Sequence, residues 1–269
     1  MDLTRRRFLA GLGVAAASAL VAERAGAGLA ARLEHHWLKV RHGDLDGRLI
    51  AHLTDLHCDG EKSAERIHQA VDLVNRCRPD LVLLTGDFVT WGTDYVERVA
   101  TLLSRLRAPR FAVLGNHDHY AGAEAVTKAL TAAGTGVLDN TSAVATLGAA
   151  RVRLIGIGDA NTGHENIAKA IDGVAADDDL RIALCHNPSS ADGLPPGTAD
   201  LILAGHTHGG QIRIEWLTPW VVRQTGSNYV SGFFDLPAGR LYVNRGWGTV
   251  GIPTRLGAPA EIALFHCRL

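Results

Sequence analysis

The 269-residue sequence predicts an α/β fold, and three features of the chain support this prediction. Apolar strands alternate with amphipathic helices between residues 48 and 133, which is the pattern of an α/β domain. The second half of the chain contains mostly short strands. Five of the apolar strands are followed at once by Asp, Asn or His, and ligands of open α/β sheets bind beyond the carboxyl ends of the strands.

The composition excludes several classes of protein. The chain is 46% hydrophobic with a net charge of −1, so it is not intrinsically disordered and lacks the basic excess of a general nucleic-acid binder. No specific nucleic acid is therefore expected as a partner. The 13 histidines are the first indication of a functional site. The length suits a single domain, which we expect over residues 28–269.

Residues 1–27 are predicted to be an export signal that lies outside the fold. Residues 5–9, Arg-Arg-Arg-Phe-Leu, resemble the start of a twin-arginine leader, so the twin-arginine export machinery is an expected partner. The uncharged run over residues 8–22 is shorter than the roughly 20 residues of a membrane-spanning helix. Cleavage is expected after the Ala-x-Ala at residues 25–27, and retention of the segment as an anchor stays open.

In the first half of the chain, three helices are expected between strands. Alternation predicts a strand over residues 34–42, a turn over 44–47 and a strand over 48–54. Apolar residues at helical spacing predict helices over 64–76, 95–106 and 123–133. Residues 80–85 and 110–114 are nearly continuous apolar runs, which indicates strands that are buried on both faces.

The second half of the chain is expected to be mainly β. Short strands are predicted over residues 137–138, 143–147, 151–157, 180–185 and 200–204, with a short helix over 165–171. From Gln211 onward, strands and loops with Gly and Pro punctuation are expected. Five aromatic residues in this tail could form an apolar lip or pack on the core: Trp216, Trp220, Tyr229, Phe233 and Phe234.

The residues that follow the five strands form a set of oxygen and imidazole ligands without thiolates. These residues are Asp55, His57, Asp87, Asn116, His117, His186, His206 and His208. Such a set suits a divalent metal, and eight candidate groups exceed what one tetrahedral ion needs. Two of the pairs, Asp55-x-His57 and His206-x-His208, have i, i+2 spacing, so on an extended segment both side chains of a pair point the same way. Asp87 stands alone and offers two oxygens that can bridge two ions.

Taken together and in this order, these motifs resemble the calcineurin-like metallophosphoesterases. The series runs Asp55-Leu-His57, Gly86-Asp87, Gly115-Asn116-His117-Asp118, His186-Asn187 and Gly205-His206-Thr207-His208. The longer GHTHGGQ segment and the closing RLGAPAE segment resemble a bacterial subgroup of exported, phosphodiesterase-like members. The resemblance implies a four-layer α/β/β/α sandwich of two mixed β-sheets flanked by helices, with the site at its rim.

The resemblance also implies a role for each motif residue. Asp55, His57 and His208 would hold one metal, Asn116, His186 and His206 would hold the other, and Asp87 would bridge them. His117 would face the substrate as a catalytic residue, and Asp118 would orient the ring of His117. The cofactors would be two divalent ions from among Mn, Zn, Fe and Ni.

These expectations define a dinuclear metal-dependent phosphohydrolase, most simply a phosphodiesterase at the cell envelope. Hydroxide held between two cations would attack phosphorus in line with the leaving oxygen, and His117 would stabilise the leaving group. The substrate is expected to be a phosphate ester, open to being lipid- or envelope-linked, and contact with a membrane stays open. The expected location is the periplasm or the outer face of the cytoplasmic membrane.

Three alternative functions stay open at the level of sequence. The first is a pyrophosphatase acting on a lipid-linked or nucleotide-linked substrate. The second is a non-catalytic metal-binding scaffold, although such proteins typically lose a ligand or the residue equivalent to His117. The third is a single-metal redox protein that uses Asp55, His57 and His208, which would leave the other three metal-ligand candidates without a function.

Overall fold

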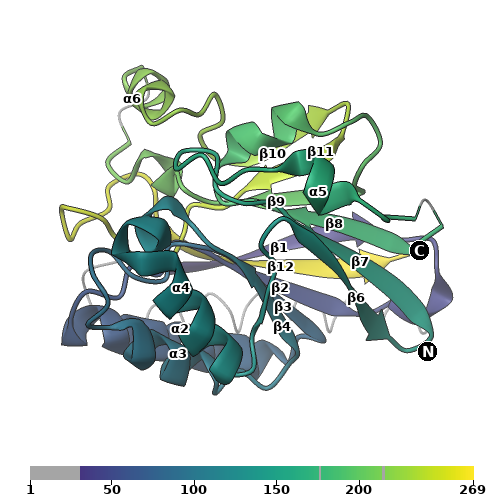
Figure 1. Cartoon of the computed structure of the whole chain (residues 1–269), viewed down its shortest axis with the longest axis horizontal. Coiled ribbons are helices and arrows are strands. Elements are labelled where there is room, and N and C mark those ends of the chain that lie inside the picture. The colour runs from purple at the N-terminus through teal and green to yellow at the C-terminus, as the bar shows by residue number, and fades with distance from the viewer. Residues whose placement is uncertain (1–30, 176, 214–215) are drawn as a thin grey trace, which may run out of the picture.

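Two six-stranded β-sheets packed face to face form the part of the chain that the computed structural model describes, residues 31–175, 177–213 and 216–269 (Figure 1). The first sheet has the order β1-β12-β2-β3-β4-β5. Its strands are β1 (Ala31–Lys39), β2 (Leu49–Leu53), β3 (Leu81–Thr85), β4 (Arg110–Val113), β5 (Gly136–Val137) and β12 (Ala260–Arg268). The strands from β2 to β5 are parallel, whereas β12 is antiparallel to β2.

The second sheet has the order β10-β11-β9-β8-β7-β6. Its strands are β6 (Thr141–Leu147), β7 (Ala150–Gly156), β8 (Leu180–Leu184), β9 (Leu201–Ala204), β10 (Gly232–Leu236) and β11 (Gly239–Val243). The four central strands are parallel, and the two edge strands β6 and β10 are antiparallel to their neighbours. Both sheets are therefore mixed, as the sequence led us to expect.

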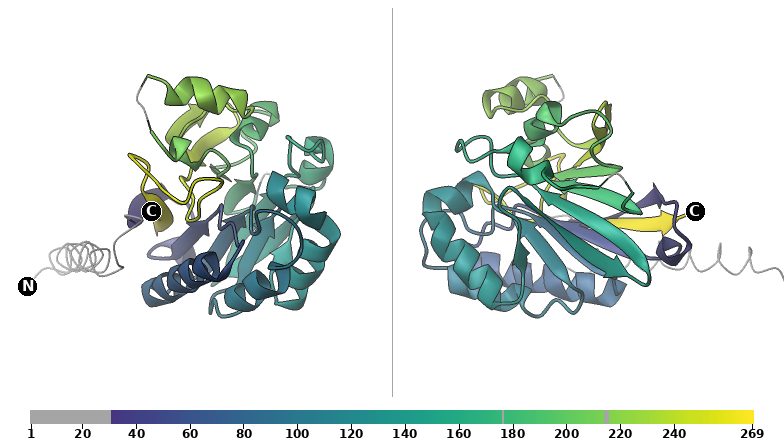
Figure 2. Two further views of the ribbon diagram at one scale, coloured as in Figure 1. Left: turned by 90° about the vertical axis from the view of Figure 1, so that its left-hand side faces the viewer. Right: turned by 45° about the vertical axis from the view of Figure 1, so that its right-hand side comes forward.

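Helices cover the outer face of each sheet. The helices α2 (Glu61–Cys77), α3 (Val96–Leu103) and α4 (Asn116–Ala132) pack on the first sheet, and the short helix α5 (Ile167–Ile171) lies on the outer side of the second. In both views of Figure 2 the helices of the first half lie on one side of the sheets and the segments of the second half on the other. The predicted four-layer α/β/β/α sandwich is confirmed.

The position of strand β3 explains why residues 80–85 form a nearly continuous apolar run. Val82 and Leu84 belong to the core between the first sheet and its helices, whereas Leu81 and Leu83 face the core between the two sheets. All five residues of β3 are buried, so both faces of the strand need apolar side chains. The same helix-side core takes the buried face of α2, as the i, i+3, i+4, i+7 spacing predicts.

Two elements differ most from the prediction. Helix α4 begins at Asn116 rather than at residue 123, where the N-cap residue Gly115 donates its N–H to the Asp118 carboxylate in the first turn, and Gly122 (φ 131°) interrupts it where the apolar period begins. The tail also contains a short helix, α6 (Thr218–Gln224), which starts with Pro219 in its first turn and which the sequence analysis had assigned to strands and loops. Of the tail aromatics, Trp216 and Trp220 are exposed, whereas Tyr229 and Phe234 pack against the outer core of the second sheet.

The predicted export signal at residues 1–27 lies outside the described residues. Among the residues that the structure describes, no helix combines the length and apolar character needed to cross a bilayer.

Candidate metal centre

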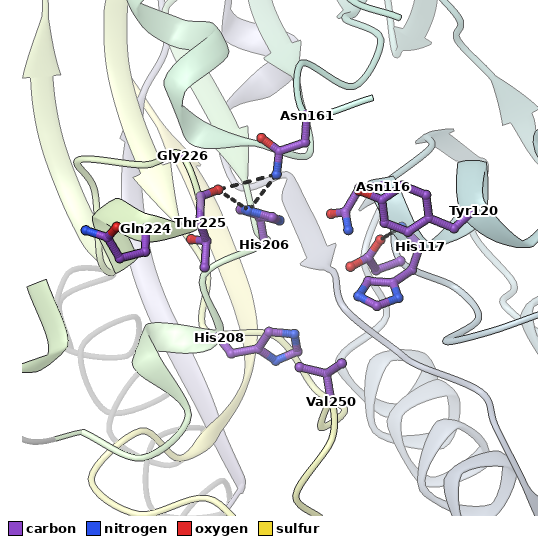
Figure 3. Close-up of a pocket in the computed structure, with 11 residues that line it drawn as sticks. Asn116, His117, Tyr120, Asn161, His206, His208, Gln224, Thr225, Gly226 and Val250 are labelled. Carbon is purple, nitrogen blue, oxygen red and sulfur yellow. Dashed lines mark hydrogen bonds between the residues drawn. The ribbon is translucent and has the colours of Figure 1, made fainter. Parts of the chain in front are cut away.

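The carboxyl ends of five strands from the two sheets bring all eight predicted residues to one rim of the sandwich. Asp55 and His57 follow β2, Asp87 follows β3, and Asn116 and His117 form the first turn of α4 after β4. From the second sheet, His186 follows β8, and the loop after β9 carries His206 and His208. Figure 3 shows Asn116 and His117 on one side of the pocket and His206 across it. The rim is therefore built jointly by both sheets.

One group of donor atoms consists of Asp55, His57 and His208, whose potential ligand atoms all lie within 4.8 Å of one another. The Nε2 atoms of His57 and His208 are 3.0 Å apart, and Nε2 of His208 is 3.3 Å from Oδ1 of Asp55. His57 and Asp55 are fully buried and His208 is 5% exposed. Three buried donors at this spacing are the arrangement that a metal ion requires.

Asp87 joins this group to a second one. Its Oδ2 atom is 3.5 Å from Nε2 of His57 and 3.2 Å from Nε2 of His186, so one carboxylate faces histidines from both sheets. His206 completes the second group, because its Nδ1 lies 3.2 Å from Nε2 of His186. Asp87 also accepts the backbone N–H of His117 at 2.9 Å, which places its charge at the N-terminus of α4.

The hydrogen bonds behind His186 and His206 turn one ring nitrogen of each toward the site. Nδ1 of His186 donates to the carbonyl of Thr85 (2.7 Å), so its Nε2 is the nitrogen that faces Asp87 and His206. Nε2 of His206 donates to the carbonyl of Thr225 (3.1 Å), so its Nδ1 faces His186. A carbonyl behind a ligating histidine fixes its tautomer and orientation in metal sites.

Asn116 supplies an independent sign that the site fits a metal. Its Oδ1 atom is buried and has no hydrogen-bond partner among the described residues, although buried amide oxygens are nearly always paired. It follows β4 in the same rim and lines the same pocket as Asp87 and His206. An unpaired amide oxygen beside imidazole nitrogens and a carboxylate forms an oxygen and nitrogen donor set that suits a divalent cation.

Burial and charge shift the pKa values in this cluster strongly. Burial lowers the pKa of His57 to about 3 and raises that of the Asp55 carboxyl to about 6. His186 is the exception, because burial lowers its pKa but the Asp87 carboxylate outweighs burial and raises it to about 10. Without a metal ion, the protonated imidazole of His186 therefore balances the charge of the buried Asp87 carboxylate. A bound cation would take over that role.

The backbone at the site is unusual. Five of the seven predicted metal ligands are non-glycine residues with a left-handed φ: Asp55, His57, Asp87, His206 and His208. The prediction that the two i, i+2 pairs lie on extended segments is therefore wrong. Left-handed residues each cost about 1–2 kcal/mol relative to ordinary backbone, and such conformations cluster at functional sites.

Glycines allow the loops that carry the candidate ligands to lie close to one another. A Cβ on Gly115 would lie 2.2 Å from Oδ1 of Asp87 and 2.8 Å from Cε1 of His186. A Cβ on Gly205 would lie 2.4 Å from Oδ2 of Asp55. These residues therefore have to be glycine for the two sheets to bring their ligands together.

Asp118 does not have the role that the sequence analysis gave it. Its two oxygens accept four backbone N–H groups, from Asp87 (2.8 Å), Phe88 (2.8 Å), Val89 (3.2 Å) and Gly115 (2.9 Å). It is fully buried, so it fastens the loop after β3 to the start of α4. Asp118 is thus a positioning residue for Asp87.

The backbone carbonyl of Thr90, rather than Asp118, orients the ring of His117. Its Nδ1 donates to the carbonyl of Thr90 at 2.8 Å, so Nε2 is the ring nitrogen left for a substrate. His117 lines the pocket together with Asp87 and Asn116, and its ring centroid is 5.0 Å from that of His57. His117 therefore stands beside the predicted ligands.

Arg255 is a residue of the site to which the sequence analysis assigned no role. Its guanidinium donates to Nδ1 of His208 (3.1 Å) and to the carbonyls of Gly248, Arg245 and Ala258. Burial lowers its pKa to about 10, so it stays charged at neutral pH. In the sequence, only the resemblance of the RLGAPAE segment, which begins with Arg255, pointed to this residue.

We expect Arg255→Lys to weaken metal binding by about 10- to 100-fold, because a single ammonium cannot hold the ring and the carbonyls together. The affinity would be measured by competition with a chelator. Arg107→Lys is the matched control, since Arg107 is exposed. Equal metal affinity of Arg255→Lys and the wild type would contradict this role of Arg255.

Comparisons with known proteins agree with this geometry. The family model for calcineurin-like phosphoesterases matches residues 48–210, which contain every predicted ligand. An uncharacterized metallophosphoesterase of Bacillus subtilis, YkuE, is 31% identical over 98% of this chain and 97% of its own length. The phosphodiesterase YaeI of Escherichia coli is also 31% identical, over 98% of this chain and 99% of its own.

A solved structure supports the fold. The 5′-nucleotidase precursor of Thermus thermophilus superimposes with a TM-score of 0.50 at 19% identity, covering 74% of this chain and 48% of the nucleotidase. Metal ligands, family match and relatives together identify a metal-dependent phosphohydrolase. The chain belongs to the calcineurin-like phosphoesterase family.

Proposed function

We propose that the protein is a phosphodiesterase with a dinuclear metal centre that works at the cell envelope. The observation that carries this proposal is the position of Asp87, whose carboxylate lies 3.5 Å from His57 and 3.2 Å from His186. Asp55 and His208 extend the His57 side, and His206 and Asn116 extend the other. One bridging carboxylate with three further ligands on each side suits two ions better than one.

The pocket beside this cluster favours a diester as the substrate. It has a volume of about 520 Å³, and none of the described residues that line it is Lys or Arg. A monoester or a polyphosphate brings charge that cationic side chains usually neutralise. A diester carries one negative charge, which the metal centre alone can balance. The name of the relative YaeI agrees with this choice.

Each part of the pocket has a task in this proposal. Bound metal ions supply positive charge to the phosphoryl oxygens and lower the pKa of water at the site. His117 lies next to the ligands with its Nδ1–H held by Thr90, so the ring, when protonated on both nitrogens, would give the proton on Nε2 to the ester oxygen that departs. On the opposite wall, Gln224 offers an amide that can hydrogen-bond to the rest of the substrate.

The proposal is tested by metal reconstitution. The purified protein is stripped of metal and assayed with a chromogenic phosphodiester and a phosphomonoester after addition of Mn, Zn, Fe or Ni. We expect a metal to restore cleavage, with the diester preferred, and two metal equivalents per chain by elemental analysis. Binding of two equivalents without cleavage of either ester would overturn the enzymatic proposal in favour of a scaffold.

His117→Ala is expected to lower kcat for the diester by about a hundredfold, the lower range for loss of a general acid or base. Metal content should fall much less than activity, because His117 lies in a donor group with His57 and Asp87 but has its Nδ1 engaged by the carbonyl of Thr90. Elemental analysis and steady-state kinetics on the same preparation separate the two effects. A loss of metal in proportion to activity would make His117 a ligand instead.

Envelope location is the remaining part of the proposal, and the leader at residues 5–9 supports it. Exposed apolar side chains in the C-terminal part of the chain agree with work close to a membrane: Trp216, Trp220, Ile252 and Leu256. We expect the Arg5→Lys/Arg6→Lys double variant to stay in the cytoplasm, whereas the matched Arg7→Lys variant is exported. Cell fractionation distinguishes the two, and export of the double variant would contradict this location.

A further inference from the structure

The metal centre does not explain two aromatic side chains beside His117: Tyr120, which lines the pocket, and Trp91, which packs against His117 and Tyr120. Trp91 follows Thr90, whose carbonyl holds His117, and Tyr120 lies one helical turn after His117 on α4. We propose that Trp91 and Tyr120 form a stacking platform for a planar aromatic ring on the ester group that lies next to His117. This inference rests on the proposed function for the position of the phosphate.

The two side chains are arranged around His117. The Trp91 ring centroid is 4.7 Å from that of His117 and that of Tyr120 is 5.9 Å, both edge to face. The two rings are themselves nearly parallel, with 13° between their planes and 6.4 Å between centroids. A planar group that stacks on one ring is thus already oriented for the other.

Packing of the protein does not account for these aromatics. Trp91 is 66% exposed and Tyr120 is 58% exposed, and neither belongs to the cores defined by the described residues. Neither the indole N–H nor the phenol hydroxyl has a hydrogen bond within the described part of the chain. Large aromatic faces that stay exposed beside a binding site are typical of ligand contacts.

The opposite wall makes the pocket asymmetric. Asn161 contacts His206 through its amide, and Asn161, Gln224 and Thr225 all lie across the pocket from Tyr120 (Figure 3). One ester group of the substrate thus meets flat apolar surfaces and the other meets hydrogen-bonding groups. The structure therefore assigns the class of the first group as an uncharged aryl or heterocyclic ring, in preference to a saturated chain.

The test compares two ligands of similar size, one with a planar aromatic ring and one with a saturated ring. Benzylphosphonate and cyclohexylmethylphosphonate have a P–C bond that the enzyme cannot hydrolyse, so binding is measured without turnover. Calorimetric titration of the metal-loaded protein is expected to give about two- to tenfold tighter binding of the benzyl compound, the range for one aromatic contact. Trp91→Leu and Tyr120→Leu should each abolish this preference, whereas Trp91→Phe should retain it.

Trp37→Leu is the matched control. Trp37 is 68% exposed like Trp91, but it lies on β1 and shares no contact with the described residues of the pocket. Its replacement should leave the preference unchanged. Equal binding of both phosphonates to the wild type, or a benzyl preference that survives in both leucine variants, would overturn the platform. Absence of ester cleavage in the reconstituted enzyme would instead count against the proposed function and leave this binding result standing.

Discussion

Replacing Asp87 with Asn is expected to lower kcat/KM for a phosphodiester by about a thousandfold or more. The variant keeps the size of the side chain but removes the charge that faces His57 on one side and His186 on the other. A bridging carboxylate contributes several kcal/mol to binding and charge balance at a metal pair, and each 1.4 kcal/mol is a factor of about ten. The metal content should fall together with the activity, because Asp87 is shared by both ligand groups.

The control for this variant is Asp235→Asn, since the side chain of Asp235 is 93% exposed. Kinetics and elemental analysis of the reconstituted proteins would be measured side by side. Circular dichroism before and after metal addition would confirm that Asp87→Asn folds. Wild-type activity with full metal content would contradict the bridging role of Asp87.

Asp118→Ala is expected to destabilise the protein by about 4 kcal/mol. The substitution leaves four buried backbone N–H groups without their acceptor, and each unsatisfied group costs about 1–3 kcal/mol, partly recovered if water enters. A loss of this size corresponds to a Tm that is lower by roughly 10 °C in a chain of this length. Asp87 would lose its fixed position at the same time, so metal affinity should fall as well.

Asp118→Asn distinguishes a role of Asp118 in fastening the two loops from a role in catalysis. Its amide keeps one acceptor oxygen but turns an NH2 group toward two of the backbone donors, so most of the destabilisation should remain. The exposed Asp94→Ala variant serves as the control. Thermal unfolding of the three variants gives the comparison. A variant with unchanged Tm and selectively lower kcat would restore Asp118 to the catalytic role that the sequence first indicated.

Much of the fold could be predicted from the sequence because its signals are local. The apolar run of β3 and the helical spacing in α2 each describe which faces of one element are buried, and the structure buries those faces. The exceptions arise where local signals are weak. Helix α4 begins at Asn116, where Asp118 in the first turn accepts the N–H of the N-cap residue Gly115, and no apolar period marks this turn.

The candidate site could be predicted as a set of residues but not as a geometry. The residue types after five strands indicate metal binding, because parallel strands deliver their carboxyl ends to one edge. The left-handed backbone of Asp55, His57 and Asp87 cannot be told from the sequence, since Asp and His adopt it more often than most residues but still only in a minority of positions. It persists only where the surrounding loops hold it.

The sequence by itself therefore determined which side chains gather at the rim and what chemistry they offer. Only the tertiary structure decided that Asp118 fastens two loops, that Arg255 holds His208, and that Trp91 and Tyr120 flank His117. Most of these contacts join residues that are far apart in the sequence, and the others depend on the conformation of a loop. Their partners depend on how the two sheets pack and how the loops close, which no local pattern of residues encodes.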